Sequence, residues 1–124
     1  MYTLEEAIEA LRPGADWIQY ETEYSGLRWL DETQTKPTEE EIVQKVAELE
    51  YKKEVEAYKQ QRAAEYPSYA DQFDQIFHDG IDAWKATILE VKRRYPKQVM
   101  EPEVLEERKR QALADLEASR EEQT

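Results

Sequence analysis

One pattern constrains the fold of this chain more than any other: apolar and aromatic residues recur every three or four positions between Tyr69 and Tyr95. Residues at this spacing lie on one face of an α-helix. Because the segment holds no nucleophile, metal cage or phosphate-binding loop, we predict that this face packs as a structural core. Its members are Tyr69, Phe73, Phe77, Ile81, Trp84, Ile88, Val91 and Tyr95.

Asp79-Gly80 interrupts this pattern near its middle. Gly80 either ends one helix before Asp82 starts a second, or lies inside a single bent helix at a cost of about 1 kcal/mol relative to alanine. We favour the break, because Asp-Gly is a turn-forming pair. Prolines bound the segment on both sides, so residues 67–97 are predicted to form an aromatic helix-turn-helix module.

The composition favours a helix-rich protein and excludes several kinds of site. Charged residues make up 37% of the 124 residues, and only three are glycine and five proline, which fits neither a disordered nor an all-β chain. The absence of cysteine excludes disulfides and thiolate metal sites. The sequence has no secretory signal and no membrane-spanning run, so we predict a soluble chain that stays in the cytoplasm of the producing cell.

The formal net charge of −12 opposes binding to phosphate backbones and to anionic lipid. We therefore expect neither a nucleic-acid nor a membrane partner. The charge is uneven, because residues 67–100 hold five acidic and five basic side chains while the flanking segments are acidic. We expect contacts with other molecules where the chain is neutral and aromatic.

Helix start and stop signals divide the rest of the chain into three parts. Residues 1–38 are predicted to hold a short helix, begun by a capping box at Thr3, and a β-hairpin. Residues 39–66 are predicted to form a long connecting helix capped by Thr38, and residues 98–124 a helical tail that frays unless a partner holds it. The predicted fold class is mainly α with a small N-terminal β-hairpin (α+β) and elongated helical arms.

The hairpin is expected within residues 16–31, which are rich in the residue types typical of strands. Ser25-Gly26 suits a two-residue turn with positive φ. Such a turn pairs Tyr24 with Leu27, and it places Glu23 opposite Arg28. An isolated hairpin is marginally stable, so its aromatic face must rest on a helix or on another chain.

His78, the only histidine, lies four residues from both Asp74 and Asp82. On an unbroken helix these three side chains share a face and could ligate a metal. A surface histidine beside solvated carboxylates is the favoured interpretation, because the break at Gly80 separates the three. The sequence has no catalytic or nucleotide-binding motif. We therefore predict no enzyme, no cofactor and no metal.

Trp and Tyr side chains are the main candidates for partner binding, because they are enriched at interface hot spots. For Trp84, within the helical pattern, a place in the core is favoured. For Trp17 the core and the contact interpretations both stay open. The residues predicted to bind a partner are Trp17, Tyr20, Tyr24, Trp29, Tyr51, Val55 and Tyr58.

Four sequence blocks, "LRPG", "YSGLRWLD", "TKPTEEE" and "YPSYADQ…DAWKATI…VKRRYPK", resemble small bacteriophage tail and tail-fibre-associated proteins of the XkdW-like family. The resemblance covers most of residues 9–97. It implies a non-enzymatic tail-fibre assembly chaperone, or a small tail or baseplate accessory protein. Its partner would be a tail-fibre or baseplate protein, in a homo- or hetero-oligomer. Its location would be the phage tail of the virion, or the host cytoplasm during assembly.

Two alternatives remain open. A small acidic helical protein could mimic DNA and inhibit a host defence enzyme, although the neutral charge of residues 67–100 counts against this. A metal or ligand binder centred on His78 is the third hypothesis and ranks last.

Overall fold

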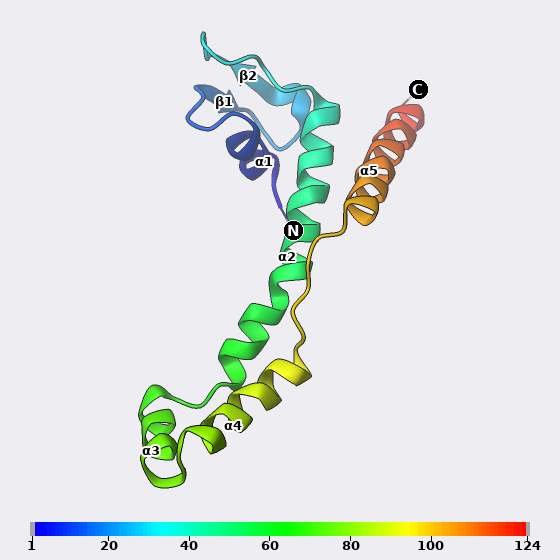
Figure 1. Cartoon of the computed structure of the whole chain (residues 1–124). Coiled ribbons are helices and arrows are strands. Elements are labelled where there is room, and N and C mark those ends of the chain that lie inside the picture. The colour runs from blue at the N-terminus through cyan, green and yellow to red at the C-terminus, as the bar shows by residue number, and fades with distance from the viewer. Residues whose placement is uncertain (1, 124) are drawn as a thin grey trace. The chain divides into compact units, whose positions relative to one another are not determined.

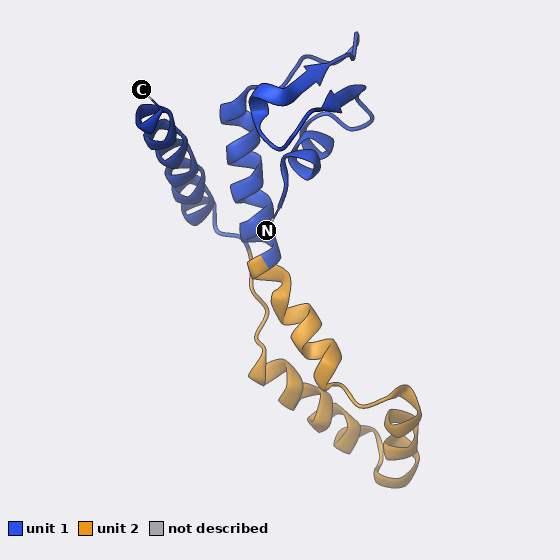
Figure 2. Ribbon diagram, turned by 180° about the vertical axis from the view of Figure 1, so that it is seen from behind, with its two compact units in different colours: residues 1–53, 100–124 blue, residues 54–99 orange. Residues whose placement is uncertain are grey.

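The computed structural model describes residues 2–123 and confirms a mainly α fold with one small β-hairpin (Figure 1). The elements, in chain order, are α1 (Leu4–Leu11), β1 (Trp17–Gln19), a 3₁₀ turn (Tyr24–Gly26), β2 (Leu27–Trp29), α2 (Glu39–Glu65), α3 (Tyr69–Asp79), α4 (Ile81–Arg94) and α5 (Pro102–Glu122). The chain forms two compact units, Met1–Lys53 with Met100–Thr124 (unit 1) and Glu54–Val99 (unit 2), and their boundary falls inside α2 (Figure 2).

Polar caps set the starts of three helices as predicted. The Thr38 hydroxyl accepts a hydrogen bond from the Glu41 amide at 3.1 Å, and the Glu41 carboxylate accepts one from the Thr38 amide at 3.3 Å, which is a full capping box. Thr3 accepts from the Glu6 amide at 3.3 Å, and Ser68 begins α3 in the same way. None of the helices within residues 2–123 is both long and apolar enough to cross a membrane.

The core of unit 1 lies where α1, the hairpin and the start of α2 meet (Figure 1). Ala7 and Ile8 of α1, Leu27 of β2 and Ile42 of α2 are buried and contact one another. Around this cluster pack six partly buried side chains: Leu4, Leu11, Trp17, Tyr24, Trp29 and Val46. The hairpin thus rests on helices of its own chain. This packing supplies the support that a marginally stable hairpin requires.

The predicted hairpin register is wrong. The strands pair Trp17 with Trp29, Ile18 with Arg28 and Gln19 with Leu27, so residues 20–26 form a long connection. Gly26 does not have a positive φ. Its role is close approach, because a Cβ there would lie 1.8 Å from the carbonyl oxygen of Tyr20. Backbone contact, rather than turn conformation, therefore requires glycine at this position.

Unit 2 contains the C-terminal part of α2 and the α3–α4 pair. The predicted break at Gly80 is confirmed: its φ is +89°, α3 ends at Asp79, and α4 begins at Ile81. The single bent helix is therefore excluded. Arg62 of α2 donates to the backbone carbonyl of Tyr95 at 2.8 Å, which ties the end of α4 to α2.

Candidate protein-contact surfaces

The aromatic side chains of α3 point away from the rest of unit 2. Tyr69, Phe73, Phe77 and, at the start of α4, Ile81 are exposed to 80%, 69%, 83% and 56%. We call these four residues the aromatic row. Their predicted place in a structural core is wrong. The α4 half of the predicted core differs, because Val91 is buried and Trp84, Ile88 and Tyr95 are half-buried.

The reason is that α3 turns a polar face toward α4. The Trp84 indole N–H donates to the Gln72 side-chain oxygen at 3.0 Å. The Gln75 amide donates to the Thr87 hydroxyl at 2.8 Å and to the Ala83 carbonyl at 3.4 Å. Since these glutamines occupy the contact between the two helices, the aromatic row lies on another face of α3. The periodicity correctly predicted which residues share a face, but not which way that face points.

The aromatic row is a large apolar surface for a chain of this size. With each aromatic side chain taken as roughly 200 Å², the exposed fractions of its three rings give about 450 Å² of exposed ring surface. Contiguous apolar patches on monomeric proteins rarely exceed a few hundred Å², and larger ones mark interaction sites. The row has one ring contact among the described residues, an edge-to-face contact of Phe77 with His78 at 5.0 Å. It is the strongest candidate for a protein contact.

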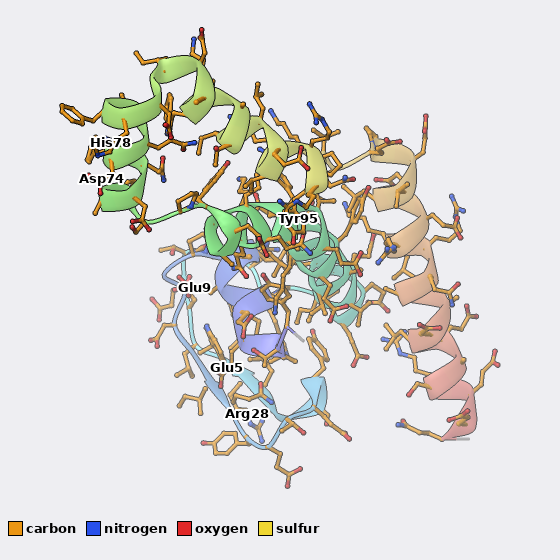
Figure 3. All side chains as sticks on the ribbon, turned by 90° about the horizontal axis from the view of Figure 1, so that it is seen from below. Glu5, Glu9, Arg28, Asp74, His78 and Tyr95 are labelled. Carbon is orange, nitrogen blue, oxygen red and sulfur yellow. The ribbon has the colours of Figure 1, made fainter. Side chains whose placement is uncertain are left out.

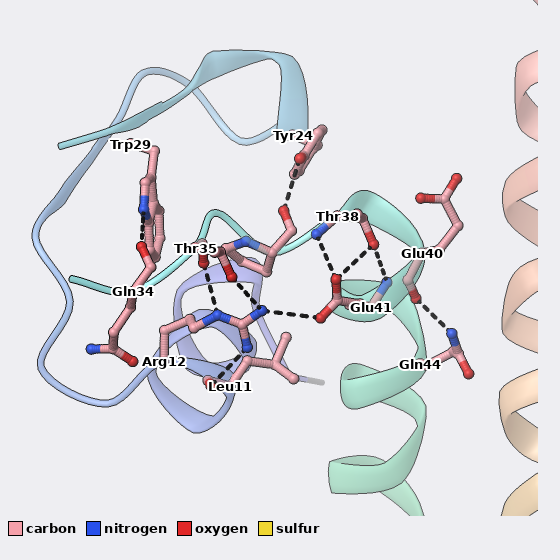
Figure 4. Close-up of polar contacts among 11 residues, drawn as sticks. Leu11, Arg12, Tyr24, Trp29, Gln34, Thr35, Thr38, Glu40, Glu41 and Gln44 are labelled. Atoms are coloured by element: carbon pink, nitrogen blue, oxygen red, sulfur yellow. Dashed lines mark hydrogen bonds and ion pairs between the residues drawn. The ribbon is translucent and has the colours of Figure 1, made fainter. Parts of the chain in front are cut away.

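Three of the predicted partner-binding aromatics pack on the core of unit 1, and Figure 4 shows the two of them that also form hydrogen bonds. The Trp29 indole N–H donates to the backbone carbonyl of Gln34, and the Tyr24 hydroxyl to that of Pro37, both at 2.8 Å. Trp17 faces Trp29 across the strand pair and packs on the core of unit 1. Each of these rings is half-buried, so little of its surface is free.

Tyr24 is also electrostatically coupled to the start of α2. Burial raises the pKa of its hydroxyl, and the carboxylates of Glu39, Glu40 and Glu41 raise that pKa further. The Lys36 ammonium lies 5.0 Å from the centre of its ring. Through these contacts Tyr24 connects the hairpin to the start of α2.

The predicted contact residues on α2 are mostly covered by the chain itself. Tyr51 is buried, its hydroxyl accepts from the Glu101 amide at 3.0 Å, and the Arg108 guanidinium lies 5.2 Å from its ring centre. Tyr58 is buried, and the Arg62 guanidinium lies 4.9 Å from the centre of its ring. Val55 is half-buried. The prediction that Tyr51 and Tyr58 are free to bind a partner is therefore wrong for this structure.

Tyr20 is the predicted contact residue that stays exposed, and it has neighbours of the same kind. Ile18 and Leu30 are exposed large apolar residues of the hairpin, and the Arg28 guanidinium lies 6.0 Å from the Tyr20 ring. Arg28 pairs with Ile18 across the strands and is labelled in Figure 3. We call Ile18, Tyr20, Arg28 and Leu30 the hairpin outer surface. It is a second, smaller candidate for a protein contact.

Arg12, which the sequence analysis did not single out, connects three parts of unit 1 (Figure 4). Its guanidinium donates to the Leu11 carbonyl at 3.0 Å, to the Thr35 carbonyl at 2.8 Å and to the Glu41 carboxylate at 3.2 Å. The pKa of Glu41 is lowered, first by the Thr38 amide and less by Arg12. The "LRPG" block carries the signal: an arginine just after a helix can bond its last carbonyls.

Asp31 organises the loop that follows β2. Its carboxylate accepts from the backbone amides of Gln34 at 2.7 Å, Asp16 at 3.0 Å and Thr33 at 3.1 Å. Hydrogen bonds to the ionised form lower the pKa of Asp31, the Gln34 amide most strongly. These bonds hold the loop that supplies the acceptor for Trp29.

The C-terminal helix α5 is held to the start of α2 by charge. Arg120 donates to the carboxylates of Glu39 at 2.9 Å and Glu40 at 2.7 Å. This contact lowers the pKa of Glu40. A cavity of about 500 Å³ is lined by α1, residues 22–25, α2 and α5, and Leu4, Ile42, Val46 and Leu116 are among its lining residues. The side chains of α5 therefore do not fill the space beside α2.

The structure does not assemble the metal site considered for His78. Asp74 and His78 lie one turn apart on α3 (Figure 3), but the break at Gly80 puts Asp82 on the next helix. Among residues 2–123, no group of three or more histidine, aspartate and glutamate side chains is placed to hold a metal ion.

Comparison of the chain with protein-family models, with curated proteins and with solved structures finds no match in any of the three.

Proposed function

We propose that this chain is a non-catalytic bacteriophage tail protein that acts by protein contact, as a tail-fibre assembly chaperone or as a small tail or baseplate accessory protein. The phage context rests on the resemblance of the four blocks between residues 9 and 97 to XkdW-like proteins. The mode of action rests on the aromatic row.

The observation that carries the proposal is the exposure of Tyr69, Phe73, Phe77 and Ile81 on a helix whose polar face is directed inward. A chain of this size has few large apolar side chains with which to stabilise its fold. Four of them are left in water here. Such exposure is costly unless another chain covers it, and aromatic residues are enriched at protein interfaces.

The distribution of charge supports a protein as the partner of unit 2. Residues 54–99 carry eight acidic and seven basic side chains, so this unit is almost neutral. A neutral surface with exposed rings suits contact with protein, whereas phosphate backbones and anionic lipids require a basic surface. In unit 1, we assign the contact with the tail protein to the hairpin outer surface. There the Arg28 guanidinium lies beside the Tyr20 ring.

Co-expression with the neighbouring tail-fibre protein tests the proposal. We expect the fibre protein to become more soluble and to trimerise with the chain present. We also expect purified virions either to contain the chain, if it is a tail component, or to lack it, if it is an assembly chaperone. The double variant Ile18→Ser/Tyr20→Ser should reduce co-purification at least tenfold, and Glu117→Ser on α5 serves as control. Unchanged fibre solubility and trimerisation without the chain, together with virions that lack it, would contradict the proposal.

The acidity of unit 1 favours a second candidate, a DNA mimic that inhibits a host defence enzyme. Unit 1 holds the remaining 21 acidic and 10 basic side chains. A mimic must present carboxylates in place of phosphates, and it would inhibit a restriction nuclease most strongly at low salt. Titration against nuclease activity that shows no inhibition at any salt concentration excludes this candidate.

A further inference from the structure

The row of exposed side chains does not end at Gly80. Steps of four continue from Ile81 onto α4 as Lys85 and Leu89, and both residues are exposed. Each helix therefore carries an exposed row of its own, and we call the two rows together the band. It is aromatic on α3, and on α4 it is aliphatic with a lysine.

The two helices that carry this band have opposite charges. Within Tyr69–Asp79, α3 holds three aspartates and neither lysine nor arginine. Within Ile81–Arg94, α4 holds two acidic and four basic side chains. The formal charges are therefore −3 on α3 and +2 on α4. Asp74 lies beside the band on α3, and Lys85 lies within it on α4.

We propose that a second copy of this chain covers the aromatic row, with α3 of each copy lying on α4 of the other about a twofold axis. The inference rests on the proposed function, in which the aromatic row is a protein contact, and it names the occupant. In a twofold interface residue i contacts residue j, and j contacts i. A surface whose halves have opposite charges is complementary to itself in that arrangement.

The polarity of the band suits a second copy in the antiparallel arrangement. If identical faces met in parallel, with α3 on α3, three aspartates would oppose three aspartates, and such like-charge contacts cost several kcal/mol. In the antiparallel arrangement the acidic helix meets the basic helix twice. The rings of Tyr69, Phe73 and Phe77 then lie against Ile81, Leu89 and the hydrocarbon stem of Lys85, which can cover apolar surface while its ammonium stays in water.

The area available indicates a reversible dimer. The rings expose about 450 Å² per copy, and Ile81, Leu89 and the Lys85 stem add to this. A standard protein interface buries about 800 Å² per partner, and weak or transient contacts lie at the low end of the range. We expect a dissociation constant of roughly micromolar order, so that association depends on concentration and on salt.

Charge reversal gives the sharpest test. Asp74→Lys/Asp79→Lys makes α3 formally +1, so both helices of this variant are positive. Lys85→Glu/Lys92→Glu makes α4 formally −2, so both helices of this variant are negative. We expect each variant alone to associate at least tenfold more weakly than the wild type in sedimentation equilibrium. An equimolar mixture should form a heterodimer with wild-type affinity to within about threefold, because both α3–α4 contacts are again complementary.

Three results would overturn the inference: a wild-type chain that stays monomeric at 14.7 kDa at every concentration, reversed variants that each still dimerise, or a mixture that stays monomeric. Phe73→Ser/Phe77→Ser should also be monomeric, and Ile18→Ser/Leu30→Ser on the hairpin outer surface should dimerise like the wild type. Circular dichroism of every variant confirms that its helices form.

The fibre experiment separates this inference from the proposed function. A dimer that has no effect on the fibre protein and is missing from purified virions would support the inference and contradict the tail function. A monomer that binds the fibre protein through the aromatic row would contradict the inference and leave the function standing.

Discussion

The two aromatic regions of the molecule use their rings in opposite ways. In the hairpin, Trp29 and Tyr24 place their rings against the core of unit 1 and direct their polar atoms to backbone carbonyls 2.8 Å away. On α3, Phe73 and Phe77 point into solvent, while glutamines make the contact with α4.

The difference shows that helical periodicity and burial are separate properties. Hydrophobic periodicity predicts that a face exists, whereas a second element must be available to bury it. The hairpin has α1 and the start of α2 beside it. Glutamines of α3 make the hydrogen bonds to α4 instead, so its aromatic face stays exposed and is the surface that we propose for contact with another chain.

The largest expected effect is in the core of unit 1. Ile8 is fully buried, so Ile8→Ala should lower the free energy of unfolding by about 3 kcal/mol through lost burial and a residual cavity. Ile81→Ala makes the same chemical change in the aromatic row and should cost about 0.5 kcal/mol or less. Urea unfolding at a concentration where the chain is monomeric compares the two. Equal losses would remove the contrast between the regions.

The hydrogen bonds of the two half-buried indoles should differ in a smaller way. Trp29→Phe leaves the Gln34 backbone carbonyl without its donor, and should cost about 1 kcal/mol. Trp84→Phe leaves the Gln72 side-chain oxygen without its donor. Because that side chain can turn toward water, the loss should be roughly half as large. Thermal unfolding of both variants tests this order. A larger loss for Trp84→Phe would show that the α3–α4 contact is the more tightly packed of the two.

Acid should weaken unit 1. The pKa values of Asp31, Glu40 and Glu41 are lowered in the folded chain, so the unfolded chain binds more protons, and stability rises with pH in that range. The contribution is complete above the ordinary values, 3.8 for Asp31 and 4.5 for the glutamates. The contribution is lost as the pH falls through the lowered pKa values of the folded chain.

Unfolding followed from about pH 6 to about pH 3 checks this sign. Asp31→Asn should flatten the curve, because it removes one of the three carboxylates whose pKa is lowered. Stability that rises on acidification would contradict the assignment.

The smallest expected effect on stability is in the aromatic row. Phe73→Ser/Phe77→Ser should change the free energy of unfolding of the monomer by no more than about 0.5 kcal/mol, because both rings are already in water. Chemical denaturation at low protein concentration measures it. A loss of several kcal/mol would show that these rings belong to a core.

Local signals in the sequence predicted much of the fold, because caps and breakers act within a few residues. Thr3, Thr38 and Ser68 begin helices as predicted, and the break at Gly80 follows from Asp79-Gly80. The hairpin register was wrong because Gly26 serves a contact with the Tyr20 backbone, and residue types do not distinguish that role from a turn with positive φ.

The candidate site was harder to predict, because it depends on contacts between residues far apart in sequence. Tyr51 looked free on its helix, but its hydroxyl accepts from Glu101, fifty residues away. Arg12 reaches Thr35 and Glu41 in a similar way. For the aromatic row, the polar character of Gln72 and Gln75 was the overlooked signal, since the pattern of apolar residues alone does not show that a polar face can make the helix contact.

The reactivity of single cysteines measures the exposure of the aromatic row directly, because the chain has no cysteine of its own. Phe77→Cys places a thiol in the aromatic row, and Val91→Cys places one at a buried position of the same unit. With a thiol reagent at low protein concentration, we predict that Cys at position 77 reacts as fast as in unfolded chain, and that protection appears as added wild-type chain forms the dimer. Cys at position 91 should react slowly throughout. A thiol at position 77 that is protected at the lowest concentration, as at position 91, would contradict the claim that α3 presents its aromatic face for assembly.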